Sequence, residues 1–483
     1  MTHETAPPRA RAVLVGVQVT GVSAAEHTAS MRELRRLVTT LGHDVIGEVS
    51  QRRAGLHGGV VLGEGKLAEL ATWTGGSGEV GPRQVRRPQK KDAREADDVE
   101  ALEDDDLDDD DALDAPDEDP EEAWAGDRPA GEALADLVVV DHELSPMQFR
   151  NLASATGARV IDRTGVIVEI FHRHASSPEA KLQVELARLH YVAPRMRDAA
   201  GGFDRQAGKG AGESQIELDR RKIRDRIAEI KEQLIAIERA RSQRRARRQD
   251  VNRVALVGYT NAGKSSWMRA LTGSPVLVAD KLFATLDTTV RAMYPEPRPR
   301  ILVSDTVGFI QKLPHDLVAS FRSTLDEALE ASLLVHVVDG SDPAWPDQER
   351  VTRTVLDEIG AQDIPTLMLF NKADKIDGQA RVVIDRFRHV GMVVSAHDPA
   401  DVQRVRAAIV DRLLGAMPEA TLVVPYDRQH VIGAIREETN VLDEVFGDEG
   451  VSYRVRAAAH VIDRLRARID PTWRPHDPDD DDA

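Results

Sequence analysis

The hydrophobic positions of the first 180 or so residues predict an α/β domain that a long polar segment interrupts. An apolar run at 12–19, a helical spacing at 31–41 and a strand-like run at 45–49 are followed by 66–73, whereas 137–141 and 158–162 flank a helical stretch at 146–155. Short continuous apolar runs are typical of buried strands. Because strands on both sides of the segment need partners, we expect residues 1–74 and 132–177 to form one domain, with 75–131 inserted into it.

Two rows of aliphatic residues then predict a pair of helices. Their members alternate at spacings of four and three, the seam of a coiled coil: Leu182, Leu186 and Leu189, then Ile223, Ile227, Ile230, Leu234 and Ile237. Between the rows, residues 197–212 hold five glycines, which helix interiors disfavour. We expect residues 178–249 to form an antiparallel helical hairpin with a glycine-rich, basic tip.

The remaining pattern predicts two further domains. Four apolar runs, each ending in a polar motif, predict a doubly wound domain over 250–415. A strand at 422–425, a helical stretch to about residue 446 and an alternating run at 451–455 predict a small α/β C-terminal domain over 416–470, followed by an acidic tail at 471–483. The fold class we expect is therefore multidomain α/β.

The first of the four motifs is a phosphate-binding loop. It follows the strand-like run 253–257 with the pattern G-x-x-x-x-G-K-S, formed by Gly258, Tyr259, Thr260, Asn261, Ala262, Gly263, Lys264 and Ser265. The glycines allow backbone N–H groups to surround phosphates, and the N-terminus of the following helix favours negative charge. Lys264 is expected to reach the β- and γ-phosphates, and the Ser265 hydroxyl to bind Mg²⁺.

The other three motifs select GTP as the nucleotide. They follow the later apolar runs in order: Asp305, Thr306, Val307 and Gly308, then Asn371, Lys372, Ala373 and Asp374, then Ser395, Ala396 and His397. Asp305 is placed to hold Mg²⁺ through bound water, and the Gly308 N–H to sense the γ-phosphate. The two Asp374 oxygens match the two N–H donors on the guanine edge, which adenine lacks, so an ATPase or kinase is disfavoured.

Three features of the catalytic machinery remain open from the residues alone. Thr285, Thr288 and Thr289 compete as the switch threonine that would bind Mg²⁺. Phe309 stands where many GTPases have a glutamine that orients water, so we expect slow intrinsic hydrolysis. Asn261 fits either a K⁺ ion beside the β- and γ-phosphates or simple capping of the loop.

The charge of the chain is concentrated in one segment. The net charge is −18, and residues 92–122 hold 19 acidic residues against one basic residue, Arg94, so the rest of the chain is neutral overall. Such runs are usually solvated and disordered. The chain has no cysteine, which excludes disulfides and thiolate metal sites, and no apolar run long enough to span a membrane. We expect a cytoplasmic protein.

In these motifs and in the segments around them, the sequence resembles the HflX family of GTPases. The resemblance is carried by Phe-Ala-Thr-Leu-Asp at 283–287, Asp-Thr-Val-Gly-Phe-Ile at 305–310 and Leu-Pro-His-Asp-Leu-Val-Ala-Ser-Phe at 313–321. The N-terminal half agrees at 142–146, 162–164, 179–186 and 212–221. Residues 10–74 and 135–460 are covered. The segment after residue 75 has no counterpart in the family pattern, and Ala211 stands where a proline is usual.

The resemblance implies a cytoplasmic factor that binds the large ribosomal subunit and its rRNA and can split stalled ribosomes under stress. It favours Thr285 as the switch threonine and Mg²⁺ ligand, making Lys264, Thr285 and Gly308 the catalytic group, and adds Phe283, Ala284, Leu286 and Asp287 to the GTP-binding segment. It favours RNA contacts at the basic tip, at Arg197, Arg205 and Lys209, over a merely solvated loop. We expect a monomer. The competing hypothesis is a GTP-binding switch that acts on non-ribosomal partners.

Overall fold

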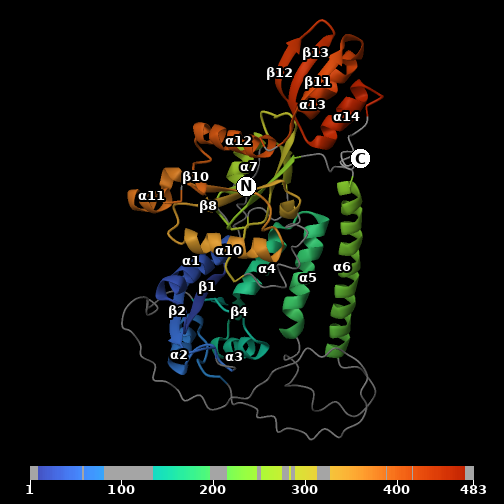
Figure 1. Cartoon of the computed structure of the whole chain (residues 1–483). Coiled ribbons are helices and arrows are strands. Elements are labelled where there is room, and N and C mark those ends of the chain that lie inside the picture. The colour runs from blue at the N-terminus through green and yellow to red at the C-terminus, as the bar shows by residue number, and fades with distance from the viewer. Residues whose placement is uncertain are drawn as a thin grey trace, which may run out of the picture. The chain divides into compact units, whose positions relative to one another are not determined.

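The computed structural model of the chain (Figure 1) describes residues 9–473, apart from 57–58, 81–133, 196–214, 247–251, 275–281, 284–288, 313–326, 388 and 416. The chain divides into two compact units, Met1–Val166 and Ile167–Ala483. Both are built from strands and helices, and the predicted multidomain α/β class is confirmed. The acidic run at 92–122, the tail from 474 and the hairpin tip lie outside the described residues.

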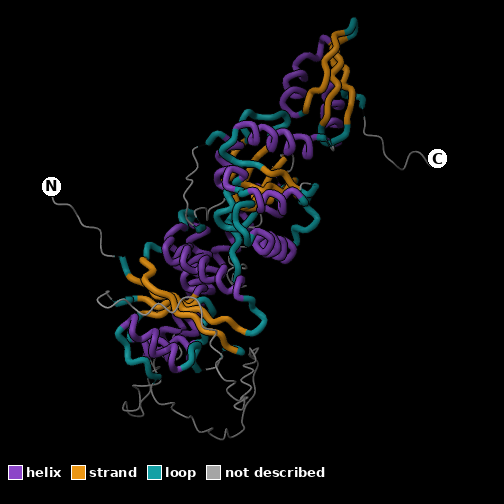
Figure 2. The backbone as a smooth tube through the Cα atoms, turned by 90° about the vertical axis from the view of Figure 1, so that its left-hand side faces the viewer, coloured by secondary structure: helices purple, strands orange, loops and turns teal. Residues whose placement is uncertain are grey.

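The first unit contains a four-stranded parallel sheet with the strand order β2-β1-β3-β4. Its elements are β1 (Arg11–Val19), α1 (Ala24–Thr40), β2 (Asp44–Arg53), α2 (Glu64–Thr74), β3 (Leu137–Val140), α3 (Pro146–Thr156) and β4 (Arg159–Asp162). β1 pairs directly with β3, so strands from the two sides of residues 81–133 share one sheet, as the sequence predicts. Val13, Val15 and Val17 of β1 belong to the core beneath α2 and α3, whereas Gly16 lies against Met31 of α1. Figure 2 shows this sheet edge-on.

The second unit begins within α4 (Arg163–His174) and continues into the helical hairpin of α5 (Pro178–Arg195) and α6 (Gln215–Ala246). The two hairpin helices run antiparallel, side by side (Figure 1). On α6 the residues of the predicted seam are shielded from solvent. Ile230 is fully buried, whereas Ile235, which lies outside the seam, is exposed. Arg226 crosses to Glu185 with two hydrogen bonds of 2.7 and 2.9 Å. α5 also buries a second face, at Ala180, Gln183, Val184 and Ala187.

The nucleotide-binding pattern occupies a six-stranded sheet with the order β10-β9-β8-β5-β7-β6. Its strands are β5 (Asn252–Val257), β6 (Thr289–Ala292), β7 (Ile301–Asp305), β8 (Leu333–Asp339), β9 (Thr366–Asn371) and β10 (Gly391–Val393), all parallel except β6. α7 (Lys264–Thr272) and α12 (Pro399–Leu414) pack on one face. α10 (Trp345–Glu358) and α11 (Gly378–Asp385) pack near Phe370 on the other, so the doubly wound prediction is confirmed.

The C-terminal elements form a three-stranded antiparallel sheet, with the order β11-β13-β12. They are β11 (Glu419–Pro425), α13 (Ile432–Glu438), β12 (Asn440–Phe446), β13 (Gly450–Arg456) and α14 (Ala459–Ile469). The expectation of helix to residue 446 is wrong, because Thr439 is extended and ends α13, and 440–446 form a strand. Val441 and Val445 are four residues apart and fit a helix face equally well, so the local pattern could not separate the two.

Candidate GTP-binding site

The four predicted motifs meet at one edge of the six-stranded sheet. Residues 258–263 connect β5 to α7, whereas Asp305 ends β7, Asn371 ends β9 and Ser395 follows β10. These four strands are parallel, so their carboxyl ends lie together. Ligands of open α/β sheets bind at that edge. The predicted strand–loop–helix context of the phosphate loop is thus present, with Lys264 as the first residue of α7.

Steric limits explain the glycines of the phosphate loop. Gly258 has a φ of 144°, and a Cβ atom added there would lie 2.2 Å from the carbonyl oxygen of Val337 on β8. Gly263 has a φ of 101°, and its Cβ would meet the Asn371 amide nitrogen at 2.2 Å. Both positions therefore require glycine. Asn261 has a φ of 60°, a region that asparagine tolerates better than most residues. The backbone conformation alone therefore explains why asparagine suits this position, without any bound ion.

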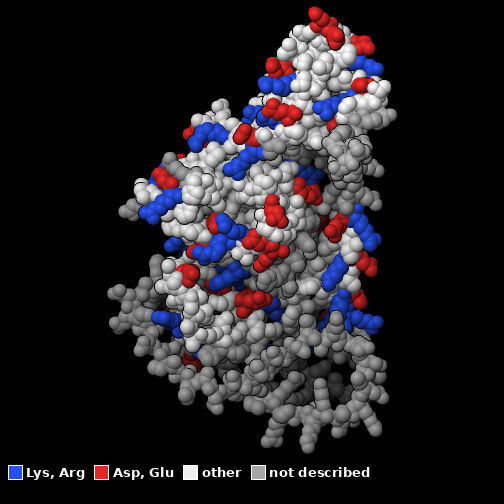
Figure 3. Space-filling model, in the orientation of Figure 1, with Lys and Arg blue, Asp and Glu red and all other residues white. Residues whose placement is uncertain are grey.

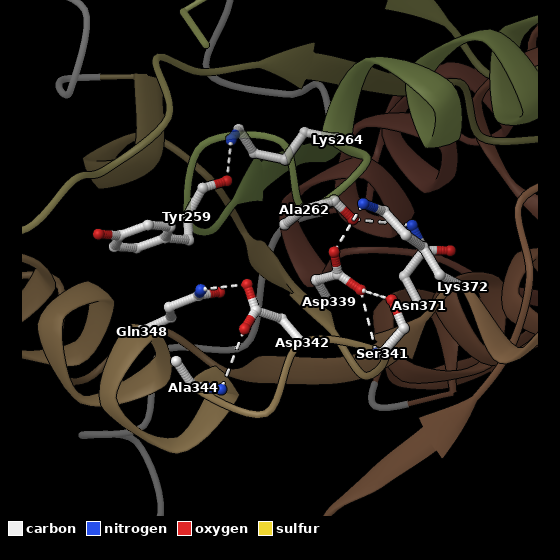
Figure 4. Close-up of polar contacts among 10 residues, drawn as sticks. All are labelled: Tyr259, Ala262, Lys264, Asp339, Ser341, Asp342, Ala344, Gln348, Asn371 and Lys372. Atoms are coloured by element: carbon white, nitrogen blue, oxygen red, sulfur yellow. Dashed lines mark hydrogen bonds and ion pairs between the residues drawn. The ribbon is translucent and has the colours of Figure 1, made fainter. Parts of the chain in front are cut away.

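Lys264 folds back over the loop that precedes it. Its ammonium group donates to the carbonyl oxygens of Gly258, at 3.0 Å, and Tyr259, at 2.8 Å. Figure 4 shows the contact with Tyr259. Burial lowers the pKa of Lys264 to about 8, although the negative charge of Asp305 acts to raise it. Gly308 lies so close that a Cβ atom on it would be 2.9 Å from the Lys264 nitrogen. One buried cation thus faces both the phosphate loop and the Asp305–Gly308 motif.

Ser265 and Asp305 present oxygen atoms suited to Mg²⁺. The Ser265 hydroxyl donates a 2.8 Å hydrogen bond to Asp305, whose side chain is fully buried. Mg²⁺ prefers oxygen ligands and is usually bound by only one or two protein groups, while water molecules and substrate phosphates fill its other coordination positions. Within the described part of the chain no group of three or more His, Cys, Asp or Glu side chains could hold a metal on its own. A hydroxyl with a neighbouring carboxylate fits an ion that arrives with a nucleotide.

The predicted guanine-binding residues form a connected hydrogen-bond network. Asn371 donates to the Ala262 carbonyl oxygen at 2.8 Å and accepts from the Ala396 N–H at 3.3 Å, so it joins three of the motifs. Asp374 accepts a 2.6 Å hydrogen bond from the Ser395 hydroxyl. That bond is the main reason the pKa of Asp374 lies below its ordinary value. Asp374 is therefore a carboxylate near neutral pH, an acceptor of hydrogen bonds.

The sequence reasoning missed Asp339 at the end of β8. One of its oxygens pairs with the Lys372 ammonium group at 2.6 Å, and the other accepts from the N–H and hydroxyl of Ser341 at 3.0 and 2.6 Å (Figure 4). Lys372 has a φ of 61°, so this ion pair holds a left-handed turn at the start of the Lys372–Asp374 motif. The signal was available, since an apolar run at 333–338 also ends in a carboxylate.

Hydrogen bonds tie the residues after Gly308 to the phosphate loop. The Phe309 N–H donates to the Gly258 carbonyl at 3.1 Å, and the Phe309 carbonyl accepts from the Thr260 N–H at 2.8 Å. The Gln311 N–H donates to the Tyr259 hydroxyl at 2.8 Å. The Phe309 side chain is 3% exposed, so it packs inside the protein. Its ring is thus in the interior as well as chemically unable to orient water.

Several predicted site residues lie outside the described part of the chain. These are Ala284, Thr285, Leu286, Asp287 and Thr288 in the switch segment, and Arg197, Arg205 and Lys209 at the hairpin tip. Thr289, a competing switch threonine, begins β6 and pairs in register with Asp305. Phe283 is described and is 3% exposed. The roles of Thr285 and of the basic tip therefore stay predictions.

Three family models match the chain in order. The description "GTP-binding GTPase N-terminal" matches residues 28–79 and 128–172, and "GTP-binding GTPase Middle Region" matches 174–248. Residues 253–372, which hold the phosphate loop, the Asp305–Gly308 motif and the first two residues of the Asn371–Asp374 motif, match "50S ribosome-binding GTPase". Among the described residues, no helix is long and apolar enough to cross a membrane.

Two proteins named GTPase HflX match long stretches of the chain. A protein named GTPase HflX from Gluconacetobacter diazotrophicus is 55% identical, over 96% of this chain and 99% of its own. GTPase HflX of Escherichia coli is 44% identical over 60% of this chain and 70% of its own. A solved GTP-binding protein from Sulfolobus solfataricus in complex with GDP is 20% identical, covers 83% of this chain and 99% of its own, and has a TM-score of 0.41, a likeness too distant to bear on the site.

Proposed function

The chain belongs to the HflX family and is a GTPase, and from this premise we propose that it acts on ribosomes, binding the large subunit and splitting or rescuing stalled ribosomes under stress. The observation that carries the proposal is the match of residues 253–372 to the family described as "50S ribosome-binding GTPase". In the structure, the four GTP motifs lie together at one edge of the six-stranded sheet that these residues help to form. We further propose that it works as a monomer.

The phosphate chemistry is assigned to groups that already lie together. Lys264 exchanges its two loop carbonyls for the β- and γ-phosphate oxygens, which places its charge where negative charge develops. Ser265, with Thr285 from the switch segment, supplies oxygen ligands for Mg²⁺, and Asp305 orients the Ser265 hydroxyl. When bound, Mg²⁺ neutralises charge on the β- and γ-phosphates. The Gly308 N–H faces the same phosphate from the end of β7.

Guanine selection is assigned to the motif after β9. Asp374 presents acceptor oxygens to the two donors of the guanine edge, while Asn371 holds the motif against the phosphate loop. The Asp339–Lys372 ion pair fixes the turn that aims Asp374. The backbone of Ser395, Ala396 and His397 is assigned to the guanine carbonyl oxygen, and the Ala396 N–H, which donates to Asn371 at 3.3 Å, would exchange that acceptor for the base.

The ribosome-facing element we propose is the hairpin. Antiparallel α5 and α6 form a rigid support on which residues 196–214 carry Arg197, Arg205 and Lys209. Arginine and lysine contacts with phosphates supply most of the affinity of proteins for RNA, and glycines permit close approach of the backbone. The partner surface is accordingly rRNA of the large subunit. In this proposal the hairpin domain spans residues 178–249 and the GTPase domain spans residues 250–415.

Co-sedimentation with purified ribosomal subunits tests the proposal. The full chain is mixed with large or small subunits in the presence of a non-hydrolysable GTP analogue, GDP or no nucleotide, and the pellet is quantified. We expect co-sedimentation with large subunits that the GTP analogue strengthens. Equal, weak recovery with both subunits in all nucleotide states would instead favour the alternative, a switch that acts on non-ribosomal partners.

A further inference from the structure

Thr260, the third residue of the phosphate loop, carries a hydroxyl group that is buried without a partner. The residue is 6% exposed, and among the residues that the structure describes none hydrogen-bonds to its side-chain oxygen. A buried hydroxyl in this state costs free energy, because the hydrogen bonds that it made to water are not replaced. Such groups are uncommon in folded proteins, and a catalytic or ligand-binding role is one reason that they persist.

Other buried threonines around the same sheet do have partners. The hydroxyl groups of Thr272, Thr306 and Thr352 donate to backbone carbonyl oxygens at 2.7, 2.7 and 3.0 Å. Thr272 has the same 6% exposure as Thr260, so burial of this degree does not by itself deprive a threonine of its hydrogen bond. Thr260 differs in its place within the phosphate loop, where a bound nucleotide would supply the missing partner.

Thr260 contacts both Gly308 and Phe309. Its N–H donates to the Phe309 carbonyl oxygen at 2.8 Å. A Cβ atom added to Gly308 would lie 2.9 Å from the Thr260 Cα, 2.9 Å from its Cγ2 methyl group and 2.9 Å from the Lys264 nitrogen. The side chains of Thr260 and Lys264 therefore meet at Gly308. A γ-phosphate held by Lys264 and the Gly308 N–H lies next to the Thr260 side chain.

A hydroxyl group at this place offers the hydrogen bonds that Phe309 lacks. The glutamine of other GTPases orients the attacking water with an amide, which has both an acceptor oxygen and N–H donors. A threonine hydroxyl likewise combines one donor with acceptor lone pairs, whereas a phenylalanine ring has neither. The Thr260 hydroxyl can therefore donate to a γ-phosphate oxygen and accept from a water molecule at the same time.

We propose that the Thr260 hydroxyl is a catalytic group that aligns the attacking water with the γ-phosphate. The water oxygen bonds to the γ-phosphorus, the bond from that phosphorus to the β–γ bridging oxygen breaks, and a water proton passes to the phosphate released. The hydroxyl orients the water and forms no covalent bond. Intrinsic hydrolysis stays slow, because a hydroxyl has fewer donors than an amide. The inference rests on the proposed placement of the γ-phosphate against Lys264 and Gly308.

Two substitutions at Thr260 separate the hydroxyl from the rest of the side chain. Thr260→Val keeps the methyl group that faces Gly308 and removes the hydroxyl, whereas Thr260→Ser keeps the hydroxyl and removes the methyl group. Single-turnover GTP hydrolysis by the full chain, without ribosomes, measures the chemical step, and a fluorescent GDP titration measures binding. We expect Thr260→Val to be roughly ten- to hundredfold slower with GDP affinity unchanged, and Thr260→Ser to stay within about threefold of the parent. A parental rate in Thr260→Val, or equal losses in both variants, would overturn the proposal.

Stability gives a second, opposite readout. Replacing a hydroxyl that has no partner with a methyl group leaves no polar atom unpaired, so Thr260→Val should melt at or above the parental temperature without nucleotide. A loss of hydrolysis through damaged packing would instead come with a lower melting temperature. A lower melting temperature would therefore contradict the proposal, because it would show that the hydroxyl is already satisfied within the protein.

Thr272→Val is the matched control. Thr272 ends α7 at the same exposure, and its hydroxyl donates to the Met268 carbonyl oxygen within that helix. Removing this hydroxyl should lower the melting temperature, since a hydrogen bond is lost, and should leave the hydrolysis rate unchanged. Equal slowing in Thr272→Val and Thr260→Val would assign the effect to a general sensitivity of the domain and would overturn the catalytic role.

A further variant distinguishes this proposal from the assignments on which it rests. If Lys264→Ala abolishes hydrolysis while Thr260→Val keeps the parental rate, the phosphate site stands and only the role of Thr260 is wrong. If Lys264→Ala keeps the parental rate, the placement of the γ-phosphate is wrong and the role of Thr260 falls with it. Binding to ribosomal subunits affects neither result, because the assay contains no ribosomes.

Discussion

The hydroxyl of Ser395 donates a 2.6 Å hydrogen bond to Asp374, and it thereby joins the turn after β9 to the segment after β10. The bond occupies one carboxylate oxygen and lowers the pKa of Asp374, so the group stays ionised in the range where the protein works. A neighbouring residue thus orients the carboxylate that we assign to guanine. This relationship makes the base specificity testable at two positions.

Replacing Asp374 with Asn should change which base is accepted. The substitution exchanges an acceptor oxygen for an N–H donor, which opposes a guanine donor and suits the additional carbonyl of xanthine. We expect GTP binding to weaken at least about tenfold and xanthosine triphosphate to become an effective competitor in a GTP-hydrolysis assay. The parent chain, which xanthosine triphosphate should not inhibit, is the control. Unchanged base preference in the variant would show that Asp374 does not contact the base.

Ser395→Ala tests the orienting bond separately. Asp374 keeps its charge but loses a partner that orients it and does not itself touch the nucleotide, so GTP affinity should fall about three- to tenfold, the net value of one ordinary hydrogen bond, while guanine remains preferred over xanthine. Isothermal titration with GDP, GTP and xanthosine triphosphate measures both quantities. A switch of base preference in this variant would mean that Ser395 itself reads the base.

The charge of Lys264 predicts a pH dependence of nucleotide binding. Burial holds its pKa at about 8 in the free protein, below the ordinary value of a lysine. Phosphate binding requires the protonated form, so affinity should be full below that pKa and should fall as pH rises through it, approaching tenfold per unit beyond. Fluorescent GDP titrations between about pH 7 and about pH 9 measure this. Lys264→Arg is the control, because a guanidinium stays charged and its weaker binding should not vary with pH over that range.

How far the sequence could predict the site depends on the range of the interactions. Gly263, Lys264 and Asp305 were identifiable because a phosphate site places fixed residue types at strand ends, and that pattern is local in sequence. The Asp339–Lys372 ion pair was missed because it depends on β8 lying beside β9, an order that a strand pattern does not give. Phe171 of α4 packs edge to face against Phe283, with ring centroids 4.6 Å apart, and this contact could not be predicted because the two residues are brought together only by tertiary packing.

The fold shows the same division. Strand-like runs at 12–19 and 137–141 were read correctly because buried parallel strands are continuously apolar. β12 was mistaken for helix because it is an edge strand that exposes apolar residues on both faces: Val445 and Phe446, which are consecutive, are 56% and 71% exposed. The alternation of buried apolar and exposed polar positions that separates a strand from a helix is therefore weak there.

Removing the acidic segment should leave the catalytic protein intact. Val80 packs against the core of the first unit, and the Gly78 N–H donates to Ala155, so the deletion is best begun after residue 81 and ended at 131, with a short Gly-Ser linker. A solvated acidic run buries no apolar surface, so we expect a parental melting temperature and basal GTPase rate within about twofold of the parent. Loss of the cooperative melt would show that the segment contributes to folding. A variant that replaces the same residues with an uncharged linker of equal length controls for chain length.

The hairpin tip should couple ribosome binding to hydrolysis. α6 extends to Ala246, and β5, which leads into the phosphate loop at Gly258, begins at Asn252, so the tip and the nucleotide site are joined through one long helix and a short connection. We expect large subunits to raise the GTPase rate well above the slow basal rate that Phe309 implies. Replacing Arg205 and Lys209 with Ala should reduce that stimulation roughly tenfold and weaken its dependence on salt, because phosphate contacts release counterions, while basal turnover stays unchanged.

Steady-state GTPase rates against subunit concentration, at two salt concentrations, measure this coupling. The matched control removes the same charge from the surface of the sheet domain, with Arg350→Ala on α10 and Arg386→Ala beyond α11, both exposed. If general electrostatic attraction drives association, the control and the tip variant lose stimulation equally, since each loses two positive charges. If the tip contacts rRNA, only the tip variant responds, and a chain in which a tight turn replaces 197–212 loses stimulation completely. Parental stimulation in that shortened chain would place the ribosome contact on another surface, because no basic tip would remain to make it.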